Sequence, residues 1–522
     1  MTSMSELLDR PADHPLVEPL DEANQELLAR VHPSGWTNPV GGGVYDLVVI
    51  GGGTAGLVSA AGAAGLGARV ALVEKALLGG DCLNSGCVPS KALLRSARAV
   101  AEIRRAGALG VRTVPVDVDF GAVMSRMRRL RAGISPHDSA HRLAKAGVDV
   151  FLGEGRFSSR RTIEVDGRTL RFNRAVIATG GRATAPPIPG LGDIGYLTNE
   201  TLFWLTDLPA RLLVIGGGPI GSEMAQAFSR FGSRVTIFES SPQLLAREDA
   251  DAAAVVQRRF VAEGIQLELG INLTRVEARG SEVVIHAERT RGDGSTERLE
   301  VAGDRVLVAA GRAPNVDTLG LEAAGVEFTR RGVTVDDHLR TSNSRIFAAG
   351  DVCSRFKFTH AADAMARIVI QNALFYGRRK ASALVIPWAT YTEPEIAHVG
   401  LYETQAREAG RTVETITVAL NDVDRAVLDD DTDGFVRVHH EKGRILGCTI
   451  VSAHAGEMIG EASYAVTHGG SLGQFSATVH PYPTEAEAFR MVGDRYRRSA
   501  VTPRAARWLA RYFRWTRGGS GL

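Results

Sequence analysis

Cysteine is scarce in this sequence, at 4 of 522 residues. Two of the four, Cys353 and Cys448, stand alone and are expected to be structural, which excludes the dense disulfide framework of a small secreted domain. The formal net charge is only +2, so no overall attraction to nucleic acid is expected. No stretch approaches the roughly 20 apolar residues of a membrane-spanning helix. What remains is a globular chain that is too long for a single core.

The first segment, MTSMSELLDRPADHPLVEPLDEANQ, is acidic, contains prolines and lacks an apolar centre. It is typical of neither a secretory signal nor a transit peptide. We therefore expect a cytoplasmic protein, in which a close cysteine pair is more often catalytic or metal-binding than structural.

One pattern occurs twice, as YDLVVIGGGTAGLVSAAGAAGLGARVALVEK from Tyr45 and as RLLVIGGGPIGSEMAQAFSRFGSRVTIFES from Arg211. Each copy predicts an apolar strand, a glycine turn, a helix and a second strand that ends in an acid. In G-x-G-x-x-G the first glycine permits the turn, the second lets the backbone approach a pyrophosphate, and the third lets the helix pack on the strand. A glycine turn without a ligand would explain one copy alone, but the repeat in register favours two dinucleotide sites. Their predicted residues are Gly51, Gly53, Gly56 and Glu74, and Gly216, Gly218, Gly221 and Glu239.

The surroundings of the two sites differ. Glu239 is followed by no arginine before Arg247, and a carboxylate there accepts a ribose hydroxyl but repels a 2′-phosphate. NADH is therefore favoured over NADPH at the second site. The first site runs directly into a cysteine pair, which indicates a dinucleotide with a redox ring, and FAD fits.

That pair, Cys82 and Cys87, lies in GGDCLNSGCVPSK. A disulfide needs Cα atoms about 4.4 to 6.8 Å apart, whereas five residues of helix rise about 7.5 Å, so the segment between them must bend. Pro89 suits the first turn of a following helix, which puts Cys87 near a helix N-terminus that lowers a thiol pKa. A zinc half-site and two unrelated thiols are the alternatives, but no second Cys/His cluster accompanies the pair, and a redox role is favoured.

GGDCLNSGCVPSK resembles the redox-active disulfide of the flavoprotein disulfide reductases, which include lipoamide dehydrogenase, glutathione reductase and mercuric reductase. The likeness extends from about Tyr45 to Val501, and AVIATGG, VAAGRAPN and IFAAGDV are similar to further motifs of that family. The resemblance implies that Cys87 faces the flavin, that Cys82 meets the substrate, and that Lys91 pairs with Glu223 near the flavin. It adds these cofactor contacts: Gly80, Lys91, Gly155, Thr179, Gly180, Gly311 and Asp351. The segment FKFTHAADAMARIVIQNAL predicts a helix that starts at Thr359, and the positive end of this helix is expected to face the flavin ring.

The predicted fold class is α/β, with two Rossmann-like dinucleotide-binding domains, the FAD domain split around the NAD domain, and a C-terminal α+β dimerisation domain. By resemblance the last domain closes the active site of the partner in a homodimer. The predicted boundaries are 1–44 for an N-terminal extension, 45–190 and 315–385 for FAD binding, 191–314 for NAD(P) binding, 386–501 for dimerisation and 502–522 for a basic amphipathic segment.

VHPYPTEAEAF carries Tyr482 where lipoamide dehydrogenases and glutathione reductases, by resemblance, have an acid/base histidine, while Glu487 is retained and His480 stands two residues earlier. A phenol with a pKa near 10 is a poor general base at neutral pH. The Pro-Tyr pairing is similar to mercuric reductases, in which the tyrosine helps hold the metal, and soft thiolates suit Hg(II). The C-terminal vicinal cysteines and the N-terminal metal-binding domain of mercuric reductase are absent from the sequence. We therefore expect either that the metal ion reaches the site by another route or that the substrate is different.

We therefore expect electrons to pass from NAD(P)H through FAD and the Cys82–Cys87 disulfide to a thiol-reactive acceptor, with Hg(II) favoured. A small disulfide, direct flavin-to-quinone reduction and a redox sensor remain open. Transient metal ligands are predicted at Cys82, Cys87 and Tyr482. The predicted catalytic residues are Cys82, Cys87, Lys91, Glu223, His480, Tyr482 and Glu487.

The segment 502–522 is rich in arginine and aromatic residues, which occupy opposite sides of a predicted helix. Such a helix either rests peripherally on an anionic membrane surface or packs against the dimer, and packing is the preferred interpretation. Its apolar side holds Trp508, Leu509, Tyr512, Phe513 and Trp515, and its basic side holds Arg504, Arg507, Arg511, Arg514 and Arg517.

Overall fold

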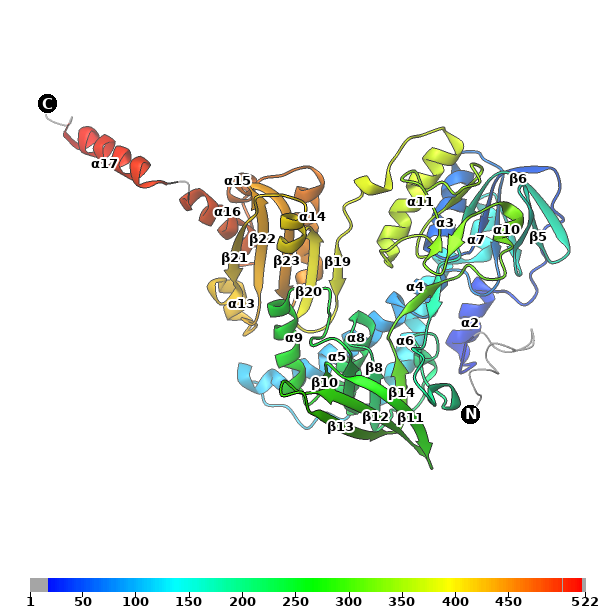
Figure 1. Cartoon of the computed structure of the whole chain (residues 1–522), viewed down its shortest axis with the longest axis horizontal. Coiled ribbons are helices and arrows are strands. Elements are labelled where there is room, and N and C mark those ends of the chain that lie inside the picture. Colours follow the sequence, from blue (N-terminus) through cyan, green and yellow to red (C-terminus); the bar gives the residue numbers. More distant parts are fainter. Residues whose placement is uncertain (1–16, 500, 519–522) are drawn as a thin grey trace. The chain divides into compact units, whose positions relative to one another are not determined.

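The computed structural model describes residues 17–499 and 501–518. These residues form two compact units (Figure 1). The first unit comprises the described part of Met1–Glu248 together with Phe260–Leu384, and the second comprises Asp249–Arg259 together with the described part of Val385–Leu522.

The first unit contains a sheet of order β3-β2-β1-β6-β5-β4, with β18 also paired to β6. Its central strands run parallel and are almost entirely buried and apolar, as expected for strands covered on both faces. Because β18 follows the second repeat in the chain, one sheet is assembled from two distant segments. The strands are β1 (Val44–Ile50), β2 (Val70–Glu74), β3 (Val148–Leu152), β4 (Arg156–Ser159), β5 (Thr162–Val165), β6 (Arg168–Ile177) and β18 (Ile346–Ala348).

Two helices from the separate segments pack together beside this sheet, α3 (Thr54–Gly65) and α11 (Thr359–Leu374) (Figure 1). A Cβ at Gly62 would lie 2.7 Å from Ile370 Cδ1, so glycine is what permits this close approach. The packing fixes the N-terminus of α11 relative to the first glycine turn.

A second parallel sheet of order β10-β9-β8-β14 holds the second repeat. An antiparallel sheet β11-β12-β13 and a short ribbon of β7 with β15 complete this region. The elements are β7 (Gly181–Ala183), β8 (Arg211–Ile215), α8 (Pro219–Phe231), β9 (Arg234–Glu239), β10 (Gln266–Leu269), β11 (Asn272–Arg279), β12 (Glu282–Thr290), β13 (Thr296–Gly303), β14 (Arg305–Val308) and β15 (Arg312–Pro314).

The second unit is built on an antiparallel sheet of order β19-β20-β23-β22-β21. Helices α14 and α16 contribute apolar side chains to the core that includes this sheet. No helix among the described residues has the length and apolar character needed to cross a membrane. The elements are β19 (Trp388–Thr390), β20 (Glu395–Gly400), β21 (Glu414–Ala419), α13 (Asp424–Leu428), β22 (Phe435–Glu441), β23 (Arg444–Ser452), α14 (Ala455–Thr467), α16 (Glu487–Ser499) and α17 (Pro503–Gly518).

Candidate active site

The first glycine turn lies at the carboxyl end of β1. Gly51 has φ +104°, and a Cβ there would lie 2.3 Å from the carbonyl oxygen of Ala178. A Cβ on Gly56 would lie 1.7 Å from the Gly51 oxygen, so the α3 helix packs against the turn only without a side chain. Gly53 differs, because its nearest neighbour would be the Cα of Gly80 at 3.7 Å. The backbone at Gly53 is therefore open to an approaching group.

The second glycine turn repeats this arrangement. Gly216 has φ +108°, a Cβ on Gly221 would lie 1.9 Å from the Gly216 oxygen, and a Cβ on Gly218 would meet nothing within 4 Å. In both turns the first and third glycines are required by the protein itself, whereas the second leaves an open cradle.

The acids at the ends of the two repeats make equivalent hydrogen bonds. The carboxylate of Glu74 accepts from Gly52 N at 2.5 Å, and that of Glu239 accepts from Gly217 N at 2.7 Å. Each also accepts from the backbone N–H two residues further on. Burial raises the pKa of Glu74. Both carboxylates are thus held at the edge of the open cradle.

Asp351 provides a test of whether a dinucleotide fits beside the first turn. Burial raises the pKa of its carboxyl group. Its nearest cation among the described residues is Arg312, whose Nε lies 3.8 Å away, and no described residue hydrogen-bonds this carboxylate. An acid in this setting is satisfied by ligand hydroxyls. Together with the open backbone at Gly53, it fits the FAD predicted for this site.

Other predicted cofactor contacts follow the end of β6. Thr179 Oγ1 donates to the Asn315 carbonyl at 2.7 Å, and Asn315 N donates to the Gly180 oxygen at 3.0 Å. A Cβ on Gly155 would lie 2.8 Å from Val73 Cγ1, which places Gly155 against β2. Gly311 lies in the neighbouring connection and accepts a backbone hydrogen bond. Because the Thr179 hydroxyl donates its hydrogen bond to Asn315, Thr179 would contact a ligand through its backbone.

The cysteine segment bends as its spacing predicts. Cys82 lies in the short helix α4 (Gly80–Asn84), and Cys87 is the first residue of α5 (Cys87–Arg105). A Cβ at the intervening Gly86 would lie 2.8 Å from the Asp81 carbonyl oxygen, so the turn needs a glycine there. Both cysteines are free thiols.

The two thiols have opposite acidity. A hydrogen bond from Cys82 lowers the pKa of Cys87 to about 6, with help from the Thr359 hydroxyl, 3.5 Å from the sulfur, and from the charge of Lys91. The same hydrogen bond, together with burial, raises the pKa of Cys82. The reduced pair therefore carries one negative charge at neutral pH, on Cys87.

Lys91 and Glu223 form the ion pair that the resemblance implies. Lys91 Nζ lies 2.8 Å from Glu223 Oε2, joining α5 to α8. Since Thr359 begins α11, the Cys87 sulfur lies beside the N-terminal ends of two helices, and each favours an anion.

The three predicted residues of the second unit have three different partners. His480 Nε2 lies 3.1 Å from both oxygens of Glu461 on α14. Tyr482 is 69% exposed and donates to Asp424 Oδ2 at 2.9 Å, which raises its pKa. Glu487 is bound by the guanidinium of Arg490. Sequence reasoning identified His480, Tyr482 and Glu487 but neither of the acids that hold the first two.

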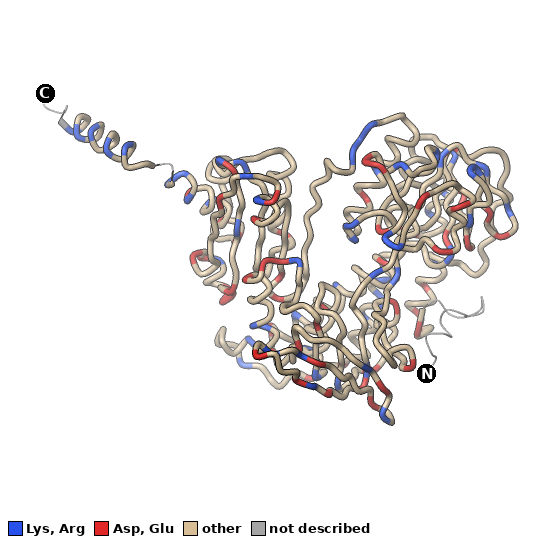
Figure 2. The backbone as a smooth tube through the Cα atoms, in the orientation of Figure 1, with Lys and Arg blue, Asp and Glu red and all other residues tan. Residues whose placement is uncertain are grey.

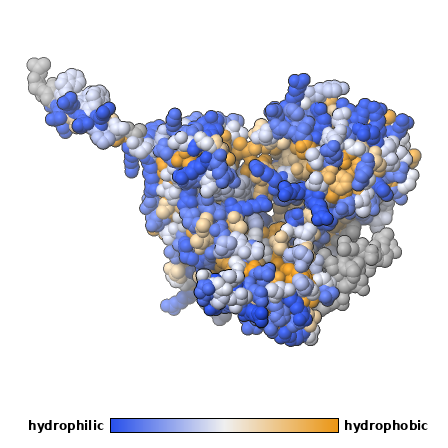
Figure 3. Space-filling view, viewed as in Figure 1, coloured by the Kyte–Doolittle hydropathy of each residue, from blue (hydrophilic) through white to orange (hydrophobic). Residues whose placement is uncertain are grey.

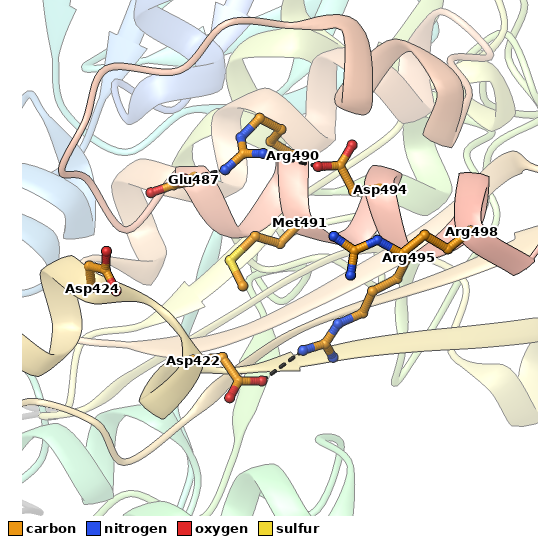
Figure 4. Close-up of a pocket in the computed structure, with 8 residues that line it drawn as sticks. All are labelled: Asp422, Asp424, Glu487, Arg490, Met491, Asp494, Arg495 and Arg498. Atoms are coloured by element: carbon orange, nitrogen blue, oxygen red, sulfur yellow. Dashed lines mark hydrogen bonds and ion pairs between the residues drawn. The ribbon is translucent and has the colours of Figure 1, made fainter. Parts of the chain in front are cut away.

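A pocket of about 240 Å³ lies beside Asp424 and Glu487 (Figure 4). Its wall combines carboxylates with arginines, which form the Asp422–Arg495 and Arg490–Asp494 pairs. It is lined by Asp422, Asp424, Glu487, Arg490, Met491, Asp494, Arg495 and Arg498. The described residues contain no group of three or more His, Cys, Asp or Glu side chains placed to hold a metal ion.

Two family descriptions match the chain. "Pyridine nucleotide-disulphide oxidoreductase" matches residues 45–366, and "Pyridine nucleotide-disulphide oxidoreductase, dimerisation domain" matches residues 386–492. The chain belongs to the pyridine nucleotide-disulphide oxidoreductase family. It is a flavoprotein oxidoreductase of a family that uses FAD and NAD(P)H.

The relatives of this oxidoreductase include mercuric reductases and dihydrolipoyl dehydrogenases. The mercuric reductase of Streptomyces lividans is 37% identical over 461 residues, which cover 87% of this chain and 96% of the relative. The dihydrolipoyl dehydrogenase of Thermus scotoductus is 34% identical over 466 residues, which cover 88% and 98%. The solved HOCl-induced flavoprotein disulfide reductase RclA from Escherichia coli aligns with a TM-score of 0.77 at 29% identity, covering 86% of this chain and 99% of that one. RclA is also solved as a Cu(II) complex. The predicted family and fold class are confirmed.

Sequence reasoning missed one charged group of this oxidoreductase. The Arg312 guanidinium forms an ion pair with Asp81, the residue directly before Cys82, and donates to the Gly181 carbonyl at 2.9 Å. Asp81 lies in the motif GGDCLNSGCVPSK and Arg312 in the motif VAAGRAPN, so the sequence identified both segments. Their pairing was not, because 231 positions separate them.

Proposed function

We propose that this oxidoreductase uses NADH to reduce a thiol-reactive metal ion at the Cys82–Cys87 pair, with Hg(II) as the principal candidate. The observation that carries the proposal is Tyr482, an exposed phenol at the position where a disulfide-reducing relative would need a histidine base. The mercuric reductase relatives and the Cu(II) complex of RclA support a metal ion as acceptor.

FAD, when bound, supplies the ring that takes a hydride from the nicotinamide and returns the electron pair to the sulfurs. The Cys82–Cys87 disulfide gains two electrons and two protons as its S–S bond breaks. Cys87 releases its proton at neutral pH, because its pKa is about 6. Cys82 keeps its proton until an electrophile replaces it. The overall balance is NADH + Hg(II) → NAD⁺ + Hg(0) + H⁺.

Tyr482 is assigned to orient the metal ion. Because Asp424 raises the pKa of its phenol, Tyr482 stays protonated at neutral pH and cannot serve as the base. In the proposed homodimer the dimerisation domain of a second copy brings Tyr482 to the cysteine pair. The enzyme is placed in the cytoplasm, as its sequence predicts.

The test is a panel of acceptors under anaerobic conditions. NADH oxidation at 340 nm and release of Hg(0) vapour are measured with Hg(II), and NADH oxidation is measured with lipoamide and with glutathione disulfide. We expect Hg(II) to be turned over at least about tenfold faster than either disulfide, and Tyr482→Phe to slow Hg(II) alone. Faster turnover of a disulfide, with Hg(II) acting only as an inhibitor, would reject the metal proposal.

A small disulfide is the second candidate, and His480 is the observation that favours it. Its ring is paired with Glu461, and its Nδ1 has no hydrogen-bond partner among the described residues. A histidine–carboxylate pair is a competent general base. If a disulfide is the substrate, His480→Gln should lower its turnover about 100-fold and leave Hg(II) turnover unchanged.

The lowered pKa of Cys87 in the reduced Cys82–Cys87 pair predicts the pH at which its thiolate forms. A lowered pKa means that the Cys87 thiolate is present above about pH 6 and lost below it. Thiolate absorbance at 240 nm, measured against Cys87→Ser, should rise with a midpoint near that value. Lys91→Met should move the midpoint up by about one pH unit. Glu223→Gln should move it down, because Glu223 opposes the thiolate. If both variants shifted the midpoint of the thiolate titration in the same direction, this electrostatic explanation would be contradicted.

Nicotinamide preference gives a second prediction. We expect kcat/KM for NADH to exceed that for NADPH, because the Glu239 carboxylate repels a 2′-phosphate. Ser240→Arg adds an exposed cation next to that carboxylate and should reduce the ratio about tenfold. Ser281→Arg, in the exposed turn between β11 and β12, is the matched control. A wild-type preference for NADPH would overturn the assignment.

A further inference from the structure

Helix α17 presents two chemically distinct faces. Its 16 residues, PRAARWLARYFRWTRG, include five arginines and no acidic residue. Figure 2 shows the basic positions recurring along the helix, and Figure 3 shows hydrophilic and paler residues together on its visible face. At about 100° per residue the arginines occupy one continuous arc and the aromatic residues the opposite one.

The aromatic arc is a row of exposed rings. Trp508 stacks on Tyr512 with centroids 5.8 Å apart, and Tyr512 lies 6.3 Å from Trp515. These three rings are 65%, 44% and 75% exposed, and Phe513 is 53% exposed. Among residues 501–517 no side chain is buried. Within the single chain the helix is therefore uncovered, and its packing on a dimer partner stays a prediction.

We propose that α17 docks on the surface of an anionic lipid bilayer. Tryptophan and tyrosine are favoured at the boundary between headgroups and acyl chains, where the ring is apolar and its polar end stays wet. Five arginines on the other side complement anionic headgroups. The helix, about 24 Å long, would lie in the plane of the surface. A nucleic-acid backbone would engage only the arginines and leave the aromatic row in water, so charge and apolarity together favour the bilayer.

The experiment uses the full-length, flavin-loaded protein and vesicle flotation. Vesicles of phosphatidylcholine with about one third phosphatidylglycerol are compared with phosphatidylcholine alone. We expect the protein to float only with the anionic vesicles, and to be released as NaCl rises from about 0.05 to 0.5 M. Deletion of residues 503–522 should abolish flotation while NADH-driven turnover in solution is unchanged.

Point variants separate the two faces without removing the helix. Arg507→Gln/Arg511→Gln/Arg514→Gln should weaken binding at least about tenfold, and Trp508→Ala/Trp515→Ala should weaken it at any salt concentration. The control Arg104→Gln/Arg105→Gln/Arg112→Gln removes the same charge from exposed positions of the first unit and should leave binding unchanged.

Three outcomes would overturn the proposal. The first is equal flotation of the intact and the shortened protein. The second is that deletion lowers the oligomer mass in light scattering while neither form binds vesicles, which assigns the aromatic row to a second copy. The third is binding to duplex DNA in preference to anionic vesicles, which assigns the arginine arc to phosphodiesters.

Discussion

Cys82→Ser should lower NADH-driven reduction of the acceptor by about 1,000-fold or more, whichever thiol-reactive acceptor is used. The serine hydroxyl cannot form the S–S bond, and it is not a soft ligand. Cys87 keeps its contact with the Thr359 hydroxyl, 3.5 Å from its sulfur, so a thiolate still forms at one position. The reduced variant should therefore retain one reactive sulfur and lose turnover.

Cys353→Ser is the matched control for this experiment. Cys353 lies outside the pair and donates from its sulfur to the Gly350 carbonyl, a hydrogen bond that serine can also make. Its turnover should stay within about twofold of the unmodified protein. Full metal reduction by Cys82→Ser would refute the dithiol mechanism, and quinone reduction that survives loss of both cysteines would assign the electron flow to the flavin alone.

Gly53→Val is expected to give a folded protein that has lost most of its flavin. A Cβ at Gly53 meets only the Gly80 Cα, at 3.7 Å, so the protein itself accommodates a side chain. The same side chain would fill the cradle in which backbone approaches a pyrophosphate. Flavin absorbance near 450 nm per mole of protein should fall at least about tenfold, with NADH turnover falling in proportion.

Gly65→Val controls for the chemistry of this substitution. Gly65 lies at the other end of α3, and a Cβ there would meet nothing within 4 Å. Melting curves must compare both variants with flavin-stripped protein, because a bound ligand raises the melting temperature. Normal flavin content in Gly53→Val would show that the cradle does not hold the dinucleotide.

Much of this site could be predicted from the sequence because its parts depend on residues that are close together in the chain. Glycine turns, terminal acids and the bend between Cys82 and Cys87 each depend on residues within one short segment. The start of α11 at Thr359 was likewise predicted from its own segment. The Lys91–Glu223 pair came from resemblance, since 132 positions separate the two residues.

The partners of the second unit were not predictable in the same way. Nothing local indicates that Tyr482 meets Asp424, 58 positions earlier, or that His480 meets Glu461 rather than Glu487. These contacts depend on how α13, α14 and α16 pack around one sheet. Side-chain pairing across packed elements is a tertiary property, and a motif identifies only one member of each pair.

The isolation of Cys353 and Cys448 has a practical consequence for counting molecules. Burial raises the pKa of Cys353 to about 12 and also raises the pKa of Cys448, so neither is a thiolate at neutral pH. An alkylating reagent added to the reduced protein should therefore consume one equivalent per chain quickly, at the Cys87 thiolate, and should react with Cys353 and Cys448 only on unfolding. The folded protein thus reports its own concentration of working centres by simple stoichiometry.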